Sequence, residues 1–373
     1  MRSISDTISR LDAMKSRFGA AAATAPATRL SAFGEFGSNP GALNGFSYTP
    51  ADLPRNAPLV VVLHGCTQTA AGYDHGAGWS RLADRHGFAV LYPEQRRENN
   101  ANLCFNWFVP SHTSRGSGEA LSIAQMVGEM VARHDLDPAR VFVTGLSAGG
   151  AMVSVMLATY PELFSGGAVI AGLPYGCAAS IPEAFDRMRG HGLPSEARLK
   201  AAVLGASDHR GPWPSLAIWH GGADRTVSPA NMEAIVSQWR DLHGLQGVQP
   251  EQSMIGRHSR RLYRDAAGHV RIEAIDIAGM GHGTPLSAAD DIGAVGPFML
   301  DAQISSTRHI ARSWNLTETG SALALPTQPE QTEPEAQPLP AWKRSGRAAP
   351  RPAAAVGVGK VIEDALRAAG LMR

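Results

Sequence analysis

A serine stands where nucleophilic catalysis would need one. Residues 145–149 read Gly-Leu-Ser-Ala-Gly, directly after the apolar run 141–144 and before the helix-forming run 151–156. In this strand, turn and helix context, a G-x-S-x-G motif carries a nucleophile on a sharp turn, where side chains in place of the glycines would collide with the neighbouring strand and helix. The amides at the helix start would favour a developing negative charge. We therefore predict Ser147 as a nucleophile; the alternative is a chance match in a chain with 40 glycines.

A serine hydroxyl is a weak nucleophile until a base removes its proton, so a histidine is expected downstream. Among the 13 histidines, His282 is the best placed, because it lies between two glycines in the loop after the apolar run that ends at Ile277. His220 also follows a predicted strand, but it belongs to the turn expected to hold the acid. His309 falls on a predicted helix, where a surface or core role is expected. We predict His282 as the general base.

The acid that orients the histidine should follow a strand between the serine and the histidine in the chain. Asp224 fits this position, since it ends the turn His-Gly-Gly-Ala-Asp after the apolar run 216–219. Its predicted role is to hold the imidazole tautomer and stabilise the imidazolium. Asp208 is the competing acid, although no strand precedes it as clearly. Asp224 could alternatively be only a turn or helix-cap residue.

Two backbone N–H groups are expected to bind the oxyanion. One belongs to Ala148, the residue after the predicted nucleophile. The other is expected in the loop after the apolar run 59–63, where His64-Gly65 is followed by Cys66. We predict the amides of Cys66 and Ala148 as the oxyanion donors, a role that leaves the Cys66 side chain free for structure.

These residues sit in loops of a predicted α/β alternation. Buried strands are expected at 59–63, 88–92, 141–144, 216–219 and 272–277, and helices at 79–86, 121–131, 228–242 and 310–314. Short buried strands alternating with amphipathic helices predict a mostly parallel central sheet with helices on both faces. Active sites of such sheets lie at the carboxyl ends of the strands. Residues 171–215 show no pattern that predicts their fold.

The composition is that of an ordinary globular enzyme. The 373 residues carry a formal net charge of +1 with no long basic run, which argues against nucleic-acid binding. No stretch reaches the length of a transmembrane span, and charges at Asp6, Arg10, Asp12 and Lys15 interrupt any signal-like apolar segment. The sequence alone therefore favours a cytoplasmic location. No metal or organic cofactor is expected.

Four segments are predicted along the chain. Residues 1–30 form an N-terminal amphipathic helix and linker, 31–315 the α/β-hydrolase catalytic domain, 316–352 a Pro/Glu/Gln-rich linker, and 353–373 a short C-terminal helix. The terminal helices are candidates for contact with a polymer granule or a partner protein. For the first helix, packing on the catalytic body is the ordinary expectation, and binding to a membrane or a partner is the alternative.

The motifs together resemble the esterase family of polyhydroxybutyrate depolymerases, which also contains feruloyl and acetyl-xylan esterase relatives. The resemblance rests on segments 63–68, 92–95, 104–108, 145–149, 219–224 and 279–282. It implies an α/β-hydrolase fold, the triad Ser147, Asp224 and His282, and short-chain polyester or other carboxylic-ester substrates. Because the family is mostly secreted, the resemblance also makes an extracellular location an alternative.

Several residues in or near these motifs are candidates for the rim of the site. Cys66 and Cys104 are expected either to form a disulfide that braces the oxyanion loop or to be two buried thiols. Trp107 is a candidate apolar wall for the substrate, with a core tryptophan as the alternative. The other candidates for substrate contact are Asn106, Tyr175 and Trp213.

Three other functions remain open at this stage. The same triad could serve a feruloyl or acetyl-xylan type esterase on soluble esters, or a peptidase or amidase. A third function, of another class, is a non-catalytic protein that binds a granule or partner on a hydrolase scaffold. The complete set of predicted triad residues argues against that third function.

Overall fold

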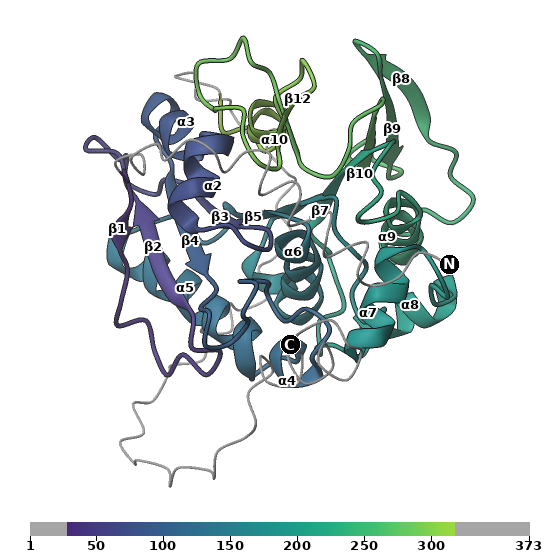
Figure 1. Cartoon of the computed structure of the whole chain (residues 1–373), viewed down its shortest axis with the longest axis horizontal. Coiled ribbons are helices and arrows are strands. Elements are labelled where there is room, and N and C mark those ends of the chain that lie inside the picture. The colour runs from purple at the N-terminus through teal and green to yellow at the C-terminus, as the bar shows by residue number, and fades with distance from the viewer. Residues whose placement is uncertain (1–27, 318–373) are drawn as a thin grey trace, which may run out of the picture. The chain divides into compact units, whose positions relative to one another are not determined.

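A ten-stranded sheet is the main element of the computed structural model, which describes residues 28–317 (Figure 1). Six adjacent strands of the sheet run parallel. In spatial order these are β4 (Ala89–Glu94), β3 (Leu59–Leu63), β5 (Val141–Leu146), β6 (Gly166–Ile170), β7 (Ser215–Gly221) and β10 (Val270–Ile277). The predicted mostly parallel sheet is therefore confirmed.

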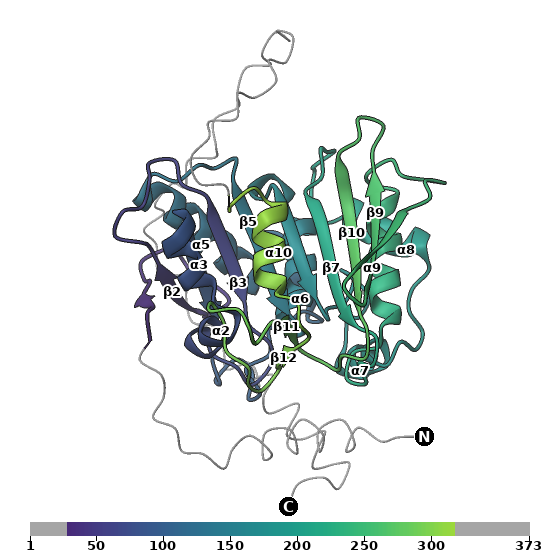
Figure 2. The same ribbon diagram turned by 90° about the horizontal axis from the view of Figure 1, so that it is seen from above.

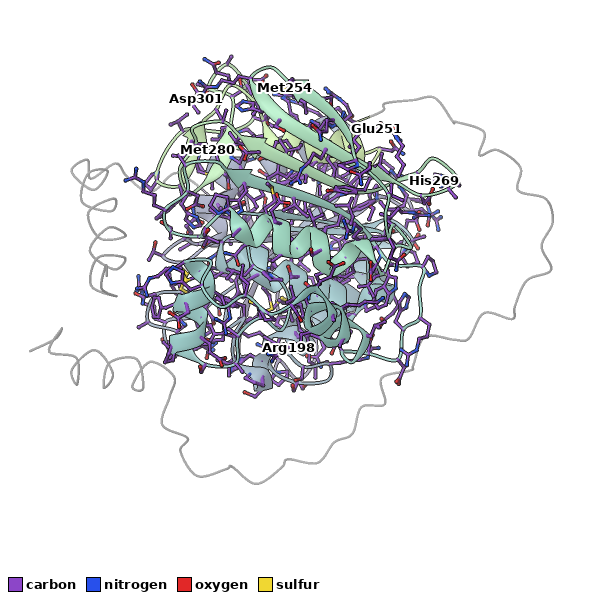
Figure 3. The ribbon with its side chains drawn as sticks, turned by 90° about the vertical axis from the view of Figure 1, so that its right-hand side faces the viewer. Arg198, Glu251, Met254, His269, Met280 and Asp301 are labelled. Atoms are coloured by element: carbon purple, nitrogen blue, oxygen red, sulfur yellow. A yellow bond between two sulfur atoms is a disulfide. The ribbon has the colours of Figure 1, made fainter. Side chains whose placement is uncertain are left out.

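Antiparallel strands extend the sheet at both edges. Beside β4 lie β2 (Asn44–Tyr48) and β1 (Ser31–Ala32), and beside β10 lie β9 (His258–Arg264) and β8 (Glu251–Ile255). The outermost strand β8 is almost wholly exposed, and Figure 3 shows Glu251 and Met254 on this edge. Its polar composition suits an edge strand with little to bury.

Helices cover both faces of the sheet because each inner strand is apolar on both sides. In β3, Leu59, Val61 and Leu63 join one buried cluster, whereas Val60 and Val62 join the other. One face is covered by α5 (Gly118–His134), α6 (Ala148–Thr159), α8 (Glu196–Leu204) and α9 (Ala230–Arg240). The other is covered by α2 (Ala70–Ala77), α3 (Trp79–His86) and α10 (Ser306–Ser313), and Figure 2 shows α10 across the middle of this face.

Smaller elements complete the described part. They are α4 (Pro110–Thr113), the 3-10 helix η1 (Pro161–Leu163), α7 (Ile181–Met188), and the parallel pair β11 (Thr284–Leu286) and β12 (Met299–Asp301). None of the helices between residues 28 and 317 is long and apolar enough to cross a membrane. The predicted N-terminal helix and the predicted segments beyond residue 317 lie outside the described residues.

All five predicted strands are present, and so are the four predicted helices, of which 79–86 has the predicted ends and the other three have shifted ends. Strand β6 was not predicted, because it begins with Gly166-Gly167 and glycine is rare in strands. Its glycines are required by packing, since a Cβ on Gly167 would lie 2.5 Å from the Leu157 side chain. The segment that showed no pattern, 171–215, forms α7 and α8, which are capped by Ser180 and Ser195.

Candidate active site

Ser147 lies on a strained turn between β5 and α6. Its backbone has φ 57° and ψ −117°, outside the regions that an L-residue ordinarily adopts. The turn is held by a hydrogen bond of 2.9 Å from the Ser147 N–H to the Ile170 carbonyl of the neighbouring strand. The side chain is 9% exposed, so the hydroxyl is largely enclosed but still open to solvent. Such strain is typical of functional turns.

The glycines of the motif are required by the close approach of β3, β5 and α6. A Cβ on Gly145 would lie 2.6 Å from the Gly149 backbone, and a Cβ on Gly149 would lie 2.3 Å from the Leu63 carbonyl oxygen. Both contacts involve backbone atoms, which cannot rotate out of the way. Only glycine lets the helix begin this near the neighbouring strand.

His282 and Asp224 are hydrogen-bonded to each other. The distance from His282 Nδ1 to Asp224 Oδ2 is 2.7 Å, and both side chains are buried. The other carboxylate oxygen of Asp224 accepts from the N–H groups of Thr226 at 2.8 Å and Val227 at 3.0 Å. These bonds fix the carboxylate and leave Nε2 of His282 as the imidazole nitrogen not bound to the acid.

The pKa of Asp224 is held well below its ordinary value. Burial by itself would raise this pKa, but the charge of His282 and hydrogen bonds from His282 and His220 outweigh it. Asp224 is therefore a carboxylate at neutral pH. A buried carboxylate on Nδ1 keeps that nitrogen protonated and so orients Nε2 as the proton acceptor.

Backbone hydrogen bonds join the loop that carries the acid to the loop that carries the histidine. Gly222 N donates to Ile277 O at 3.0 Å, and Ala223 N donates to Met280 O at 2.9 Å. The approach is so close that a Cβ on Gly221 would lie 2.4 Å from the Met280 carbonyl oxygen. The separation of Asp224 and His282 is thus set by the backbone of two adjacent loops, after β7 and β10.

The competing candidates lie elsewhere or have other partners. His220 is buried, and its Nε2 donates to Val227 O at 2.9 Å and lies 3.5 Å from Asp224 Oδ2. His309 is on α10, where its Nε2 lies 3.0 Å from Glu273 Oε1. Asp208 is exposed in the loop between α8 and β7. Of the candidate acids and bases, the structure therefore brings together Asp224, His282 and, as an additional neighbour, His220.

Among the backbone N–H groups at this edge, two of those without a partner among the described residues were singled out from the sequence. They belong to Cys66 and Ala148, the two predicted oxyanion donors. The pairing of Leu63 with Gly145 in adjacent strands places the loop after β3 beside the turn that carries Ser147. The Ser147 hydroxyl likewise makes no hydrogen bond within residues 28–317. An N–H at the first position of a helix is free to bind an anion.

The loop after β3, residues 64–68, is bound to the loop after β4, residues 95–106. Cys66 and Cys104 form a disulfide, which is the bonded one of the two arrangements considered for this pair. Thr67 N donates to Asn102 O at 2.7 Å, with Thr67 in the left-handed region at φ 63°. We call these segments the oxyanion loop and the disulfide loop. Their two links restrain the position of the Cys66 amide.

The four candidates for substrate contact differ in their surroundings. Asn106 has no exposed surface, and its amide binds Glu119 and Asn100, so it supports the disulfide loop and does not reach substrate. Trp107 is 8% exposed and packs edge-on against Phe108. Trp213 is also 8% exposed and packs edge-on against Trp239 within a buried apolar cluster. Tyr175 is half-buried, with its hydroxyl 3.4 Å from Thr113 O.

Sequence reasoning missed a buried polar cluster beneath the disulfide loop. Its members are Gln95, Asn100, Asn106 and Glu119, each at most 2% exposed. Only Asn106 was singled out, for a different role. The sequence carries no clear signal for the cluster, because its four residues fall outside every predicted strand and helix, where polar side chains are expected to be exposed.

A hollow of about 550 Å³ lies at the β1 and β2 edge of the sheet, lined by Arg96 and by residues between 32 and 46. Its lining contains none of Ser147, Asp224 and His282, so this hollow is separate from the candidate active site. Among residues 28–317, no cluster of three or more His, Cys, Asp or Glu side chains is arranged to hold a metal ion.

Comparison with known proteins places the chain in a family. Residues 46–264, more than half of the chain, match the family described as esterase PHB depolymerase. The chain belongs to this family. It is a serine carboxylic-ester hydrolase of the α/β-hydrolase fold. The resemblance recognised from the six sequence motifs is thus confirmed.

The relatives of this esterase include enzymes with two kinds of substrate in their names. It is 46% identical over 291 residues to poly(3-hydroxyalkanoate) depolymerase C of Paucimonas lemoignei, covering 77% of this chain and 70% of the relative. It is 33% identical over 267 residues to acetylxylan esterase A of Aspergillus oryzae, covering 69% and 85%. The solved acetyl xylan esterase of Aspergillus awamori superimposes with a TM-score of 0.63 at 27% identity, covering 68% of this chain and 93% of that one.

Proposed function

We propose that this esterase acts by acyl transfer through Ser147, His282 and Asp224, with the amides of Cys66 and Ala148 as its oxyanion hole. The observation that carries the proposal is the buried 2.7 Å bond between His282 and Asp224, at the same sheet edge as the strained Ser147 turn. An oriented imidazole and a nucleophile presented on a sharp turn are the two requirements for activating a serine hydroxyl.

The reaction has two steps. His282 Nε2 takes the proton of Ser147 as Oγ attacks the ester carbonyl, and the oxyanion of the tetrahedral intermediate accepts hydrogen bonds from Cys66 and Ala148 N–H. The C–O bond to the alcohol then breaks, and the alcohol leaves with the proton from His282. In the second step His282 activates a water molecule, which attacks the acyl-enzyme and releases the acid and Ser147. Asp224 stabilises the imidazolium in both steps.

The proposed substrates are short-chain hydroxyalkanoate polyesters or their oligomers. This proposal rests on the 46% identity to a protein named poly(3-hydroxyalkanoate) depolymerase C over most of both chains. A second candidate is the removal of acetyl groups from xylan, which is favoured by relatives and a solved structure that are named acetylxylan esterases.

One set of assays tests both the role of Ser147 and the proposed substrates. The wild type and Ser147→Ala are assayed against p-nitrophenyl butyrate, hydroxybutyrate oligomers, amorphous polymer, acetylated xylan and methyl ferulate. We expect the substitution to lower kcat by about 10⁴-fold or more. The best natural substrate, by kcat/KM, selects between the two candidates. Equal activity of the two proteins would refute the role of Ser147, and higher kcat/KM on an amide than on the matched ester would favour a peptidase.

The terminal segments are proposed to attach the enzyme to a polymer granule or to a partner protein. Support comes from the sequence, in which Ile4, Ile8, Leu11 and Phe18 repeat at helical spacing. These residues, and those after 317, lie outside the described part of the chain.

A further inference from the structure

We propose that Glu119 is a positioning residue, a buried carboxylate that holds the disulfide loop and, through it, the oxyanion loop that carries the Cys66 amide. This inference deepens the proposed serine-esterase mechanism and rests on it. Glu119 lies in the first turn of α5 and has no exposed surface, so it does not contact substrate. Its effect on the reaction would pass through the backbone of the two loops.

The Glu119 carboxylate accepts three hydrogen bonds, all from the disulfide loop. Its Oε1 accepts from Gln95 Nε2 at 2.7 Å and from Asn106 Nδ2 at 2.6 Å. Its Oε2 accepts from the Asn106 backbone N–H at 2.8 Å. A fully buried charged group survives only with such compensation, and hydrogen bonds to an ionised acceptor are the stronger kind. The carboxylate therefore ties the start and the end of the disulfide loop to one point.

The side-chain amides of Gln95 and Asn106 cannot flip to present their oxygens to Glu119, because those oxygens already accept other hydrogen bonds. Gln95 Oε1 is occupied by Arg96 N and Asn99 Nδ2, both at 2.9 Å, so its amide nitrogen must face Glu119. Asn106 Oδ1 accepts from Asn100 Nδ2 at 3.1 Å, which fixes the second amide in the same way. If a group with its own N–H replaced the Glu119 carboxylate, that N–H would face at least one of these N–H donors, and no hydrogen bond could form between them. Even a glutamine at this position is therefore a disruptive substitution.

Gln95 transmits this restraint to the oxyanion loop. Its backbone N–H donates to His64 Nε2 at 3.1 Å, and its Nε2 also donates to Cys104 O at 3.0 Å. His64 in turn donates from Nδ1 to Gly65 O at 2.7 Å. Burial lowers the pKa of His64 to about 4, so this imidazole stays neutral and can accept from Gln95. The two residues that precede Cys66, His64 and Gly65, are thus part of the series of hydrogen bonds that begins at Glu119.

Displacement of the oxyanion loop would weaken only the stabilisation of the charge that develops in the transition state. The amide of Cys66 would bind the oxyanion strongly and the ground-state carbonyl weakly, so a shifted loop lowers kcat more than it raises KM. Loss of an oxyanion donor typically lowers kcat by about 10²–10³-fold. Because the loop would be displaced and not removed, we expect a decrease of about 10–100-fold for Glu119→Gln.

The test compares wild type, Glu119→Gln, Gln95→Met and Glu273→Gln with p-nitrophenyl butyrate at pH 8. This pH lies above the pKa of Glu119, which burial raises to about 7. The one other titratable group close to this carboxylate in the described residues is His112, whose Nδ1 lies 3.4 Å from Oε1. Glu273→Gln is the matched control, since Glu273 is also a buried carboxylate but binds Arg260 and His309, outside both loops.

Two inhibitors separate a displaced oxyanion donor from a general loss of structure. A trifluoromethyl ketone is attacked by Ser147 Oγ at its carbonyl carbon, the proton passes to His282, and the resulting oxyanion occupies the hole. Butyrate, the product acid, forms no such adduct. We expect the Glu119 and Gln95 variants to lose ketone affinity by the same factor as kcat/KM, with butyrate affinity and KM almost unchanged. The Glu273 variant should retain kcat and both affinities.

Unchanged kcat in a folded Glu119→Gln or Gln95→Met variant would overturn the inference, and so would equal losses of ketone and butyrate affinity. Should Glu119→Gln fail to fold, Gln95→Met decides, because it removes the link to Cys104 while leaving the carboxylate in place. An inert wild type would overturn the proposed function and the inference together. An active wild type with no kcat-selective loss overturns the inference alone.

Discussion

Single side chains in this esterase are arranged around buried charges. Asp224 keeps its charge in the interior because two backbone N–H groups and two imidazoles surround it. Glu119 is as deeply buried but is surrounded by neutral donors, so desolvation outweighs its hydrogen bonds and its pKa rises to about 7. The pKa values of the two carboxyl groups are therefore shifted in opposite directions.

Replacement of Asp224 by asparagine should lower kcat by about 10⁴-fold with little change in KM. An amide at this position can donate to Nδ1 and so favours the imidazole tautomer with its proton on Nε2, which cannot accept the Ser147 proton. Steady-state kinetics on p-nitrophenyl butyrate measure the effect. Asp208→Asn is the control, because Asp208 is exposed and makes no contact with the site, and it should match the wild type. A comparable loss in both variants would refute the role of Asp224.

Glu119 should make the folded state less stable as pH rises from about 4.5 to about 7. The ordinary pKa of this carboxyl is 4.5 and its folded-state pKa is about 7, so between these values the folded state holds a proton that the unfolded state has released. Stability then falls with increasing pH, by about 3 kcal/mol in total for this group. Urea unfolding at several pH values checks this against Glu119→Gln, in which that part of the decline should be missing. Parallel pH dependences of the two proteins would contradict the assignment.

At the scale of elements, the site depends on how closely β3, β5 and α6 approach each other. The turn after β5 can present the Ser147 side chain only if the next helix begins directly against the neighbouring strand. The glycines at 145 and 149 provide this space, as their contacts with the Leu63 and Gly149 backbone show. The loops after β7 and β10 are joined by backbone bonds in the same way. The relative positions of the site loops are thus set by contacts and hydrogen bonds between backbone atoms.

A Gly149→Ala substitution should destabilise the protein by about 3 kcal/mol and lower kcat, because its Cβ would lie 2.3 Å from the Leu63 carbonyl oxygen. Thermal unfolding and kinetics measure the two effects. Gly128→Ala is the matched control, since Gly128 is exposed within α5 and no atom lies within 4 Å of its added Cβ. This second change should raise stability by about 0.5–1 kcal/mol. Similar effects of the two substitutions would contradict the packing argument.

At the scale of the whole molecule, the groups assigned to catalysis all come from residues 28–317. Both buried clusters, the disulfide, and the loops after β3, β4, β5, β7 and β10 that form the site lie within this range. The family match, residues 46–264, falls within it as well. Ester hydrolysis is therefore expected to be a property of this part of the chain, whatever the terminal segments contribute.

Deletion of residues 1–27 and 318–373 should leave kcat/KM on p-nitrophenyl butyrate within about twofold of the wild type, because no described site residue is removed. If the terminal segments attach the enzyme to polymer, co-sedimentation with native hydroxybutyrate granules should be lost at the same time. Single deletions of each end would assign the effect. Full granule binding by the doubly shortened chain would refute the attachment proposal, and loss of soluble-ester hydrolysis would show that the ends support the catalytic part.

The sequence by itself determined the family, the alternation of strands and helices, and the residues Ser147, Asp224 and His282 as candidates. These were readable because strand-forming runs, glycine spacing and chain order are local properties. Buried strands such as 59–63 are apolar on both faces and can be recognised from the sequence. A motif that directly follows such a strand in the chain must lie at the carboxyl end of that strand.

Only the tertiary structure decided which polar side chains meet. Asn106, expected at substrate, is instead bonded to Glu119, which lies 13 residues further along the chain. The hairpin of β8 and β9 has no apolar pattern of its own, and the apolar run of β6 is only three residues long after its two glycines. The link from Glu119 through Gln95 to the Cys66 loop joins α5, β4 and β3. Hydrogen-bond partners of this kind depend on distances between elements, which the spacing of residues along the chain does not contain.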